Sequence, residues 1–204
     1  MIKYLFKDPK FVKSAIFPKD YPVLKTAQGG WIPEIAVVGR SNVGKSSLLN
    51  HLFGVKQLVK TSSTPGKTRM VNFFSLNDAL IFADLPGYGY AQAPQEIRKE
   101  WGPMIEAYLR NRASLQLILF LFDIRRIPSE EDRALMEWMA QQNKAVILVL
   151  TKVDKVKAHE QKQNTQKIIN SFAVQNLHYT HYSVPKHVGR EKLVRMIQDA
   201  LSGE

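Results

Sequence analysis

Three short runs of apolar residues recur along the chain and are separated by longer segments that mix apolar and polar positions. They are Ile35 to Val38, Leu117 to Phe122 and Ala145 to Leu150, and none of them contains a polar residue. Apolar runs of this length, without alternation, are typical of parallel strands covered on both faces. The sequence therefore predicts a buried sheet with these three strands near its centre.

Further strands are predicted beside these three. Val71 to Leu76 and Leu80 to Ala83 form a predicted pair around an Asn77-Asp78 turn. Phe11 to Phe17 is a predicted edge strand, and Tyr179 to Ser183 is the last strand that we expect. Together with the apolar runs, these segments predict a sheet of six or seven strands.

Helical periodicity, caps and breakers predict five helices between the strands. They run from Lys45 through Phe53 to a stop at Gly54, from about Pro94 to Asn111, from a capping box at Ser129 to Asp132 through Leu135, Met136, Trp138 and Met139, from roughly Ala158 to Phe172, and from about Val188 to Leu201 with Leu193, Val194, Ile197 and Leu201 buried. Val55 to Met70 is polar and basic without periodicity, and is predicted to be a mobile loop.

Strands that alternate with helices predict an α/β fold, in which a mostly parallel sheet carries helices on both faces. A chain of 204 residues suits one such domain and is short for two. We expect a single domain over residues 1–204, with an N-terminal extension, residues 1–33, that contains the edge strand.

The composition narrows the class of protein. The chain has no cysteine, which excludes disulfides and thiolate metal sites and fits a reducing cytoplasm. No apolar run approaches the roughly 18 residues of a membrane-spanning helix, and charges run through the first residues, unlike a secretory signal. We therefore expect a cytoplasmic protein without a transmembrane segment.

The formal net charge of +11 indicates a polyanionic partner, either nucleic acid or an anionic membrane surface. The alternative is a basic surface that serves only solubility. The membrane interpretation is disfavoured because no predicted helix has one basic and one bulky apolar face.

The strongest motif lies between Gly39 and Ser46, where GRSNVGKS follows the first buried strand directly. It matches G-x-x-x-x-G-K-[ST], the phosphate-binding loop. Glycine at Gly39 and Gly44 lets backbone N–H groups surround an anion, Lys45 supplies a positive charge for the outer phosphates, and Ser46 supplies a hydroxyl for a magnesium ion. A chance glycine-rich turn is the alternative, but a strand before the motif and a helix after it argue against that.

A second motif, DLPG, ends the strand that precedes it. Asp84 is placed to hold magnesium through a water molecule, and the Gly87 N–H to meet a terminal phosphate. An ordinary Asp-Pro-Gly turn is the alternative. The position of the motif at a strand end, some 40 residues after the phosphate loop, favours the phosphate site, because ligands of parallel sheets bind beyond the carboxyl ends of the strands.

A third motif, TKVD, spans Thr151 to Asp154 at the end of another buried strand. The Asp154 carboxylate suits the N1–H and 2-amino donors of guanine, and the Lys152 stem suits the plane of the base. Adenine lacks these donors, so its binding would cost about 1–3 kcal/mol, which gives roughly a 10- to 100-fold preference for guanine. The alternative is that Asp154 only caps a helix.

These motifs carry a resemblance to a known family. GRSNVGKS, TPGKT, DLPG and TKVD occur in the order and at the intervals of the TRAFAC-class GTPases. GRSNVGKSSLLN, TSSTPGKTR, NFF and DLPGYGYA closely resemble the EngB (YihA/YsxC) family of ribosome-assembly GTPases. The resemblance spans about residues 11 to 195 and implies a phosphate-loop GTPase domain of the Ras-like type.

The resemblance implies a set of site residues. Ser46, Thr68 and, through water, Asp84 would hold Mg²⁺, and Asn42, Lys45, Thr68 and Gly87 would serve catalysis. Residues 56–69 and 84–93 would be the two nucleotide-sensing switches. The nucleotide-binding residues would be Gly39, Arg40, Ser41, Asn42, Val43, Gly44, Lys45, Ser46, Ser47, Pro65, Gly66, Lys67, Thr68, Asp84, Leu85, Pro86, Gly87, Thr151, Lys152, Val153, Asp154, Tyr182, Ser183 and Val184.

Three positions depart from commoner patterns. Thr151 replaces the asparagine of N-K-x-D, so we expect fewer tethering bonds there, and Val184 stands where the family usually has a small residue. Tyr88 follows Gly87 where Ras-like enzymes have a glutamine, so slow hydrolysis is expected. Asn42 occupies the position that helps related GTPases to bind potassium, so K⁺ is a second candidate cofactor; the alternative is that Asn42 only braces the loop.

The resemblance implies a switch that binds GTP and GDP and acts in assembly of the large ribosomal subunit, with a link to cell division. Its partners would be a large-subunit precursor and ribosomal RNA, and we expect a monomer. A small-molecule kinase is one alternative, but TKVD has no role in that chemistry. A GTP-controlled membrane or division protein that does not act on the ribosome is the other.

Overall fold

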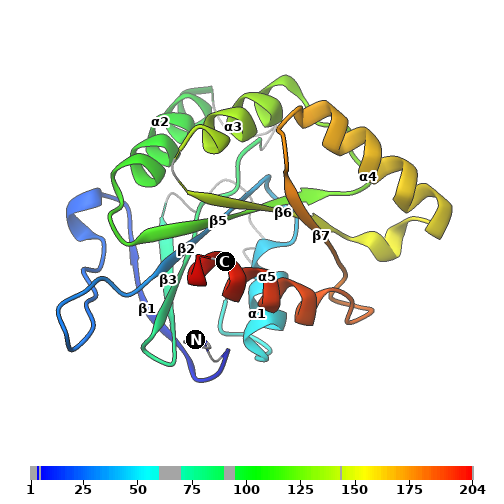
Figure 1. Cartoon of the computed structure of the whole chain (residues 1–204). Coiled ribbons are helices and arrows are strands. Elements are labelled where there is room, and N and C mark those ends of the chain that lie inside the picture. The colour runs from blue at the N-terminus through cyan, green and yellow to red at the C-terminus, as the bar shows by residue number, and fades with distance from the viewer. Residues whose placement is uncertain (1–3, 5, 60–69, 90–94, 143, 204) are drawn as a thin grey trace.

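The computed structural model describes residue 4 and residues 6–59, 70–89, 95–142 and 144–203. Within this range the chain forms one sheet with helices packed on both sides (Figure 1). The predicted loop from Val55 to Met70 falls mostly outside the described residues, and so does the end of the second predicted switch.

The described residues form a sheet of seven strands in the order β1-β3-β4-β2-β5-β6-β7. Neighbours from β4 to β7 are parallel, whereas β3 is antiparallel to both β4 and β1. This confirms the mostly parallel sheet, with an edge strand from the N-terminal extension. The bounds are β1 Pro9–Ala15, β2 Glu34–Gly39, β3 Val71–Leu76, β4 Leu80–Asp84, β5 Leu115–Asp123, β6 Ala145–Thr151 and β7 His178–Tyr182.

The helices divide between the two faces of the sheet. On one face, α2 (Gln95–Asn111), α3 (Glu130–Ala140) and α4 (Ala158–Phe172) bury a core with side chains of β2, β4 and β5. On the other face lie α1 (Lys45–Phe53) and α5 (Arg190–Ser202) (Figure 1). They bury a second cluster of apolar side chains. The alternation of strands and helices along the sequence thus gives two apolar layers around one sheet.

Local signals place most element ends where the sequence predicts them. Asn77 and Asp78 have φ of 52° and 51°, as a tight turn between antiparallel strands requires. Ser129 and Asp132 form the predicted capping box of α3. The last helix begins at Arg190 rather than at the predicted Val188, because Val188 exchanges two backbone hydrogen bonds with Ser183 and so closes a loop before the helix.

A buried carboxylate lies at the amino end of β2. Glu34 is completely buried. It accepts hydrogen bonds from the Arg112 guanidinium at 2.7–3.0 Å, from the Ser114 hydroxyl at 3.1 Å, and from the Tyr108 hydroxyl. Arg112 also donates to the Pro22 carbonyl at 2.6 Å. This cluster joins the N-terminal extension to the central strand and to the connection between α2 and β5.

The opposite edge of the sheet gathers the motif residues. The parallel strands β2, β4, β5 and β6 end beside one another, in the registers that pair Val37 with Asp84 and Asp123 with Thr151. The phosphate loop leaves β2 at this edge, and TKVD begins at the end of β6. No helix within the described residues is long and apolar enough to cross a membrane.

Candidate nucleotide site

The phosphate loop lies between the end of β2 and the first turn of α1. Gly44 has φ of 107° and immediately precedes α1, so the N–H groups of the first helical turn are directed to the loop. Asn42 also has positive φ, 62°. The strand, loop and helix that the motif requires are all present, and the arrangement can bind a phosphate anion through the backbone.

Lys45 and Asp84 are two buried charged groups that interact with each other at the phosphate loop. Burial lowers the pKa of Lys45, and the Asp84 charge opposes that shift. Burial also raises the pKa of Asp84 to about 6, with Lys45 acting against it. Each group is therefore held in a site that lacks enough opposite charge. A phosphate beside Lys45 would supply negative charge for the ammonium group, and a metal cation would supply positive charge for Asp84.

The donor set around Asp84 fits a magnesium ion. Asp84 Oδ1 is buried and has no hydrogen-bond partner among the described residues, so it has an unused acceptor for a metal-bound water. Ser46 is the second residue of α1, directly after Lys45. The third predicted ligand, Thr68, lies outside the described residues, together with Pro65, Gly66 and Lys67. Magnesium would neutralise charge on the phosphate oxygens.

Gly87 lies directly against the phosphate loop. A Cβ atom at this position would be 2.9 Å from Lys45 Nζ and 2.9 Å from Ser41 Cα, so only glycine fits without displacing the loop. The next residue, Tyr88, also contacts the loop, because the Ser41 N–H donates to the Tyr88 carbonyl at 2.8 Å. The predicted terminal-phosphate sensor is thus placed beside the two loop residues.

TKVD and the residues at the end of β7, which are predicted to contact the guanine base, line a cavity of about 270 Å³. We call it the base cavity. It brings together predicted binding residues from three elements and adds others that the sequence analysis did not single out. The lining residues are Val43, Gly44, Ser47, Leu48, Thr151, Lys152, Asp154, Lys155, Tyr182, Val184 and Pro185. A pocket with one carboxylate among largely apolar walls suits a planar base with paired donors.

A hydrogen bond from Ser183 orients the Asp154 carboxylate and favours its ionised form. The Ser183 hydroxyl donates to Asp154 Oδ1 at 2.7 Å, and this bond lowers the pKa of the carboxyl below its ordinary value. Lys155 Nζ lies 3.6 Å from Oδ2. The carboxylate therefore stays ionised and accepts hydrogen bonds. Ser183 acts on Asp154, while its neighbour Val184 lines the cavity.

Two residues of TKVD fasten the phosphate loop to the end of β6. Thr151 Oγ1 donates to the Val43 carbonyl at 2.9 Å, and Lys152 Nζ donates to the Asn42 carbonyl at 2.7 Å. The ammonium of Lys152 thus turns to the loop, while its residue also lines the base cavity. The threonine hydroxyl thus supplies one tether to the loop, at the position where we predicted fewer tethering bonds than asparagine would make.

Asp123, at the end of β5, supports this tether and was missed in the sequence analysis. Its Oδ2 lies 3.1 Å from Lys152 Nζ and 2.7 Å from Arg125 Nη2. Burial acts to raise the pKa of Asp123, but hydrogen bonds from Arg125 and Lys152 lower it to about 2. An acidic residue at the end of a parallel strand was the available signal, since strand ends meet at the ligand edge.

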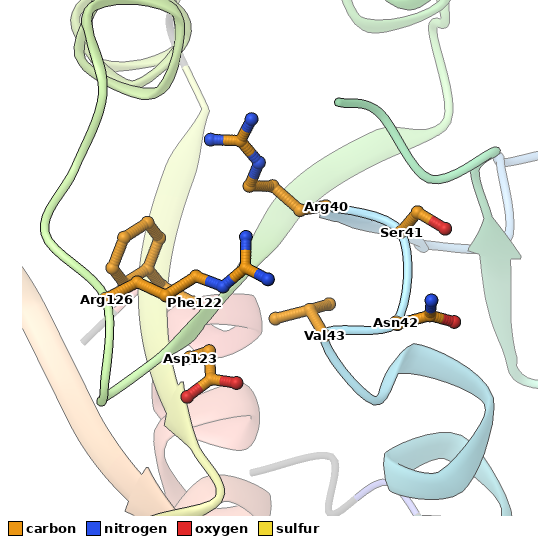
Figure 2. Close-up of a pocket in the computed structure, with 7 residues that line it drawn as sticks. All are labelled: Arg40, Ser41, Asn42, Val43, Phe122, Asp123 and Arg126. Carbon is orange, nitrogen blue, oxygen red and sulfur yellow. The ribbon is translucent and has the colours of Figure 1, made fainter. Parts of the chain in front are cut away.

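A small cavity of about 10 Å³ separates Asp123 and Arg126 from the loop, which is about the space that one water molecule needs. Figure 2 shows the Asn42 side chain on the other side of the loop, pointing away from both residues. Its exposed amide is therefore not used in the tether.

Three predicted binding residues direct their side chains elsewhere. Leu85 and Val153 are buried in the core beneath α2, α3 and α4, so only their backbone can face a ligand. The Arg40 guanidinium turns to α3 and donates to Asp132 at 2.9 Å. In all three cases the motif marks a backbone position rather than a side-chain contact.

A histidine pair joins α1 to the loop after β7. His51 Nδ1 lies 2.7 Å from the Tyr182 hydroxyl, and His51 Nε2 lies 3.0 Å from His187 Nδ1. Tyr182 lines the base cavity. This contact therefore links one wall of the cavity to the helix that opens at the phosphate loop.

Comparison with known proteins identifies the family that the chain resembles. A family model described as a 50S ribosome-binding GTPase matches residues 34–152. A GTP-binding protein named EngB from Protochlamydia amoebophila is 62% identical over 195 residues, which cover 96% of this chain and 95% of that protein. A second EngB, from Syntrophus aciditrophicus, is 46% identical over 191 residues, 94% of each chain.

Solved structures give the same result for the fold. The chain is similar to a crystal structure of an EngB GTP-binding protein, with a TM-score of 0.71 at 21% identity, over 84% of this chain and 100% of that one. It is also similar to the GTPase Era, solved with a GTP analogue and a fragment of 16S ribosomal RNA, with a TM-score of 0.65 at 26% identity, over 82% of this chain and 56% of Era. On its sequence identity to relatives along nearly its whole length, the chain belongs to the EngB family of GTP-binding P-loop GTPases.

Proposed function

We propose that this chain is a guanine-nucleotide switch with slow intrinsic GTPase activity, and that it acts in assembly of the large ribosomal subunit. The arrangement at the carboxyl edge of the sheet carries the proposal. An ionised Asp154 lines the base cavity, and Gly87 lies against Lys45 on the other side of the same loop. One ligand can therefore be recognised at its base and at its terminal phosphate.

Slow hydrolysis follows from the environment of Tyr88. Its hydroxyl donates to Asp132 at 2.8 Å, and its side chain is 2% exposed. The residue after Gly87 is therefore engaged inside the protein and does not reach the position from which a glutamine would orient a water molecule. Turnover by the isolated protein should be slow.

We propose that a potassium ion compensates for the missing glutamine after Gly87. Asn42 is exposed and points away from the tether that fixes its backbone (Figure 2). We expect faster turnover in potassium than in sodium buffers, and loss of that difference in Asn42→Ala. Asn176→Ala is a matched control, because Asn176 also has positive φ, 54°, but lies after α4. Equal turnover in both salts, unchanged in Asn42→Ala, would remove potassium from the proposal.

Ribosomal RNA is the proposed partner class. The net charge is +11, the matching family model is described as ribosome-binding, and Era was solved with ribosomal RNA. Attraction to phosphate of this kind does not depend on sequence and weakens steeply with salt.

The N-terminal extension offers a surface of suitable chemistry. Several of its large apolar side chains are exposed: Phe11, Ile16, Phe17, Val23 and Trp31. Lysines accompany two of the rings, with Lys19 Nζ 5.9 Å from the Phe17 ring centre and Lys25 Nζ 5.3 Å from that of Trp31. Aromatic rings beside ammonium groups can stack on bases and contact phosphates.

The test is co-sedimentation with ribosomal subunits and their precursors, in GDP and in a non-hydrolysable GTP analogue, across a salt series. We expect binding to depend on the nucleotide, to weaken with salt, and to weaken in a Phe17→Ala/Trp31→Ala double variant. Particle binding that responds to neither salt nor nucleotide would contradict the proposal. Flotation with anionic vesicles, without particle binding, would favour the membrane alternative, and light scattering would test the expected monomer.

A further inference from the structure

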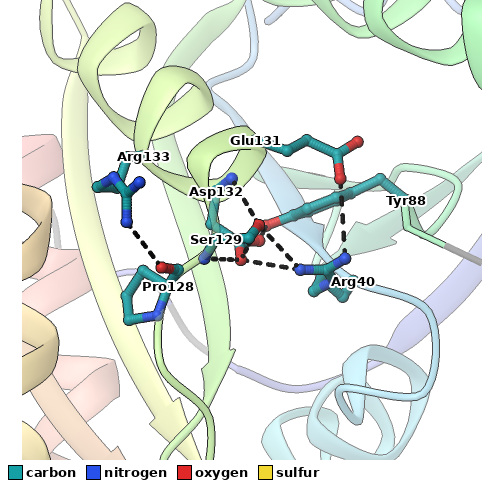
Figure 3. A network of polar contacts seen from close by, with 7 residues as sticks. All are labelled: Arg40, Tyr88, Pro128, Ser129, Glu131, Asp132 and Arg133. Atoms are coloured by element: carbon teal, nitrogen blue, oxygen red, sulfur yellow. Dashed lines mark hydrogen bonds and ion pairs between the residues drawn. The ribbon is translucent and has the colours of Figure 1, made fainter.

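Asp132, in the first turn of α3, connects two parts of the nucleotide site that are distant in sequence. Its carboxylate is completely buried. Oδ1 accepts from the Tyr88 hydroxyl at 2.8 Å, and Oδ2 accepts from Arg40 Nη1 at 2.9 Å. Figure 3 shows Arg40 and Tyr88 converging on the capping residues of α3. The same carboxylate therefore contacts the phosphate loop and the segment after Gly87.

Capping alone does not require this arrangement. The Ser129 N–H donates to Asp132 Oδ2 at 2.8 Å and the Asp132 N–H donates to Ser129 Oγ at 3.3 Å, which makes the capping box. The Ser129 hydroxyl also donates to Asp132 Oδ2, at 2.7 Å. An exposed acidic residue would cap the helix equally well. Asp132 is instead buried with an arginine and a tyrosine, which is a costly position for a carboxylate unless every partner is kept.

The Tyr88 ring is fixed as well as its hydroxyl. It stacks on Phe120 of β5 with an interplanar angle of 8°, and the Arg40 guanidinium carbon lies 5.6 Å from its centre. Burial, and then the Asp132 charge, raise the pKa of Tyr88 well above its ordinary value. The hydroxyl therefore remains a donor to Asp132 at any pH at which the protein is studied.

Arg40 is committed to the same cluster. Besides its bond to Asp132, Nη1 lies 3.1 Å from Ser129 Oγ, and Nη2 lies 3.7 Å from Glu131 Oε2. A Cβ atom on Gly89 would be 2.6 Å from the Arg40 guanidinium. The chain after Gly87 thus runs closely over Arg40, and a larger residue there would push it away.

We propose that Asp132 is a positioning residue for the nucleotide switch: it holds Tyr88, and through it Gly87, beside the phosphate loop, and so transmits the state of the terminal phosphate to α3. The inference rests on the proposed switch. Gly87 and Tyr88 are adjacent, and the Tyr88 carbonyl accepts from Ser41 of the loop at 2.8 Å. A shift of Gly87 would therefore move Tyr88 and strain its hydrogen bond to Asp132.

Loss of the bonds to Asp132 should weaken binding of a GTP analogue more than binding of GDP. With the bonds to Asp132 intact, Gly87 is already placed beside Lys45 before a terminal phosphate binds. Without them, part of the binding free energy must order this segment. We expect the affinity for a GTP analogue to fall on the order of 5- to 10-fold relative to that for GDP, with turnover reduced in parallel.

The test compares Tyr88→Phe and Asp132→Asn with the wild-type protein. Tyr88→Phe removes one hydroxyl and keeps the ring on Phe120. Arg133→Ala is the matched control, because Arg133 donates to the Pro128 carbonyl at 2.9 Å at the same helix end without contacting Arg40 or Tyr88. Equilibrium affinities for GDP and for the GTP analogue, single-turnover rates and Tm are measured on purified protein without ribosomal particles.

A lower ratio of GTP-analogue to GDP affinity in Tyr88→Phe, absent from Arg133→Ala, supports the inference. A purely structural role would lower Tm and leave the ratio within about twofold of wild type, and that result overturns it. Should Asp132→Asn fail to fold, Tyr88→Phe decides alone. If the wild-type protein itself binds neither nucleotide, the proposed function fails rather than this inference.

Discussion

Two buried carboxylates at opposite edges of the sheet have the same kinds of partner. Each accepts hydrogen bonds from an arginine, a tyrosine and a serine. Glu34, at the amino end of β2, is bonded by Arg112, Tyr108 and Ser114, and Asp132, near the carboxyl edge, by Arg40, Tyr88 and Ser129. Both are completely buried.

The difference lies in what the partners are attached to. Those of Glu34 belong to α2 and to the segment between α2 and β5, which no ligand in our account displaces. Those of Asp132 include a phosphate-loop residue and the neighbour of Gly87. The same chemistry therefore serves stability at one edge and sensing of the nucleotide at the other, and its position relative to the strand ends decides which.

The largest predicted effect is on stability, at the Glu34 edge. Arg112→Met removes the cation from a buried ion pair and should cost about 3 kcal/mol, or roughly 6–12 °C in Tm for a chain of this size. The ratio of GTP-analogue to GDP affinity should not change. Thermal unfolding monitored by circular dichroism, with nucleotide titrations, measures both quantities.

Arg110→Met is the matched control, because Arg110 is exposed on α2, close in sequence to Arg112. Its Tm should stay near that of the wild type. A change in the affinity ratio in Arg112→Met would break the comparison, because the amino edge would then also act on the nucleotide.

The next effect is on base preference, at the carboxyl edge. Asp154→Asn gives up the carboxylate that guanine donors need and gains an amide donor, which suits the 2-carbonyl of xanthine. GTP affinity should fall about 10- to 100-fold while XTP affinity rises, and Tm without nucleotide should change little. Competition between GTP and XTP for a labelled nucleotide measures this, with the exposed Asp199→Asn as control. Undiminished preference for GTP would show that Asp154 is not the base contact.

A smaller effect is expected at the tether of the phosphate loop. Lys152→Ala removes the bond to the Asn42 carbonyl and the ion pair with Asp123. Both lie on the base side of the loop, away from Gly87, so GDP and GTP-analogue affinities should fall together by roughly 2- to 5-fold. Isothermal titration would show this, and Lys162→Ala on α4 should have no effect. A fall in affinity for only one of the two nucleotides would contradict the assignment of this tether to the base side of the loop.

The smallest effect concerns pH. Burial, followed by the charges of His187 and Arg190, lowers the pKa of His51. The unfolded chain therefore binds this proton more readily, so the contribution of His51 to stability should be constant above about pH 6.5 and decrease as the pH falls below it. Because His51 is partly exposed, we expect its share of the Tm change to be a loss of only about 1–2 °C by pH 5.5. His51→Phe should flatten this dependence whereas the exposed His178→Phe should not. The raised pKa of Asp84, about 6, acts in the opposite direction as the pH falls, so the wild-type protein and His51→Phe must be compared at each pH. The same pH dependence of Tm in both would contradict the assignment.

The fold could be predicted because its signals are local. Apolar runs gave the three central strands, and glycine at Gly54 and the capping box at Ser129 gave helix ends within a residue. The start of α5 was wrong by two residues, since Val188 is held by a backbone pairing with Ser183 that only the folded loop creates. Which residues share the carboxyl edge followed from the parallel order of the strands.

The side-chain partners could not be predicted in the same way. Arg40 and Asp132 are separated by 92 positions, and nothing in either local sequence indicates the other. Asp132 was identified only as a capping residue, and Asp123 not at all, because their roles depend on how α3 and β5 pack against the loop. The roles of Thr68 and Asn42 remain predictions from the resemblance.

One pair of variants tests the central comparison most directly. Tyr88→Phe and Tyr108→Phe each remove one hydroxyl that donates to a buried carboxylate, and Tm and the ratio of GTP-analogue to GDP affinity are measured for both. We predict that Tyr108→Phe lowers Tm and leaves the ratio at its wild-type value, whereas Tyr88→Phe lowers the ratio on the order of 5- to 10-fold. Equal ratios in the two variants would contradict the account.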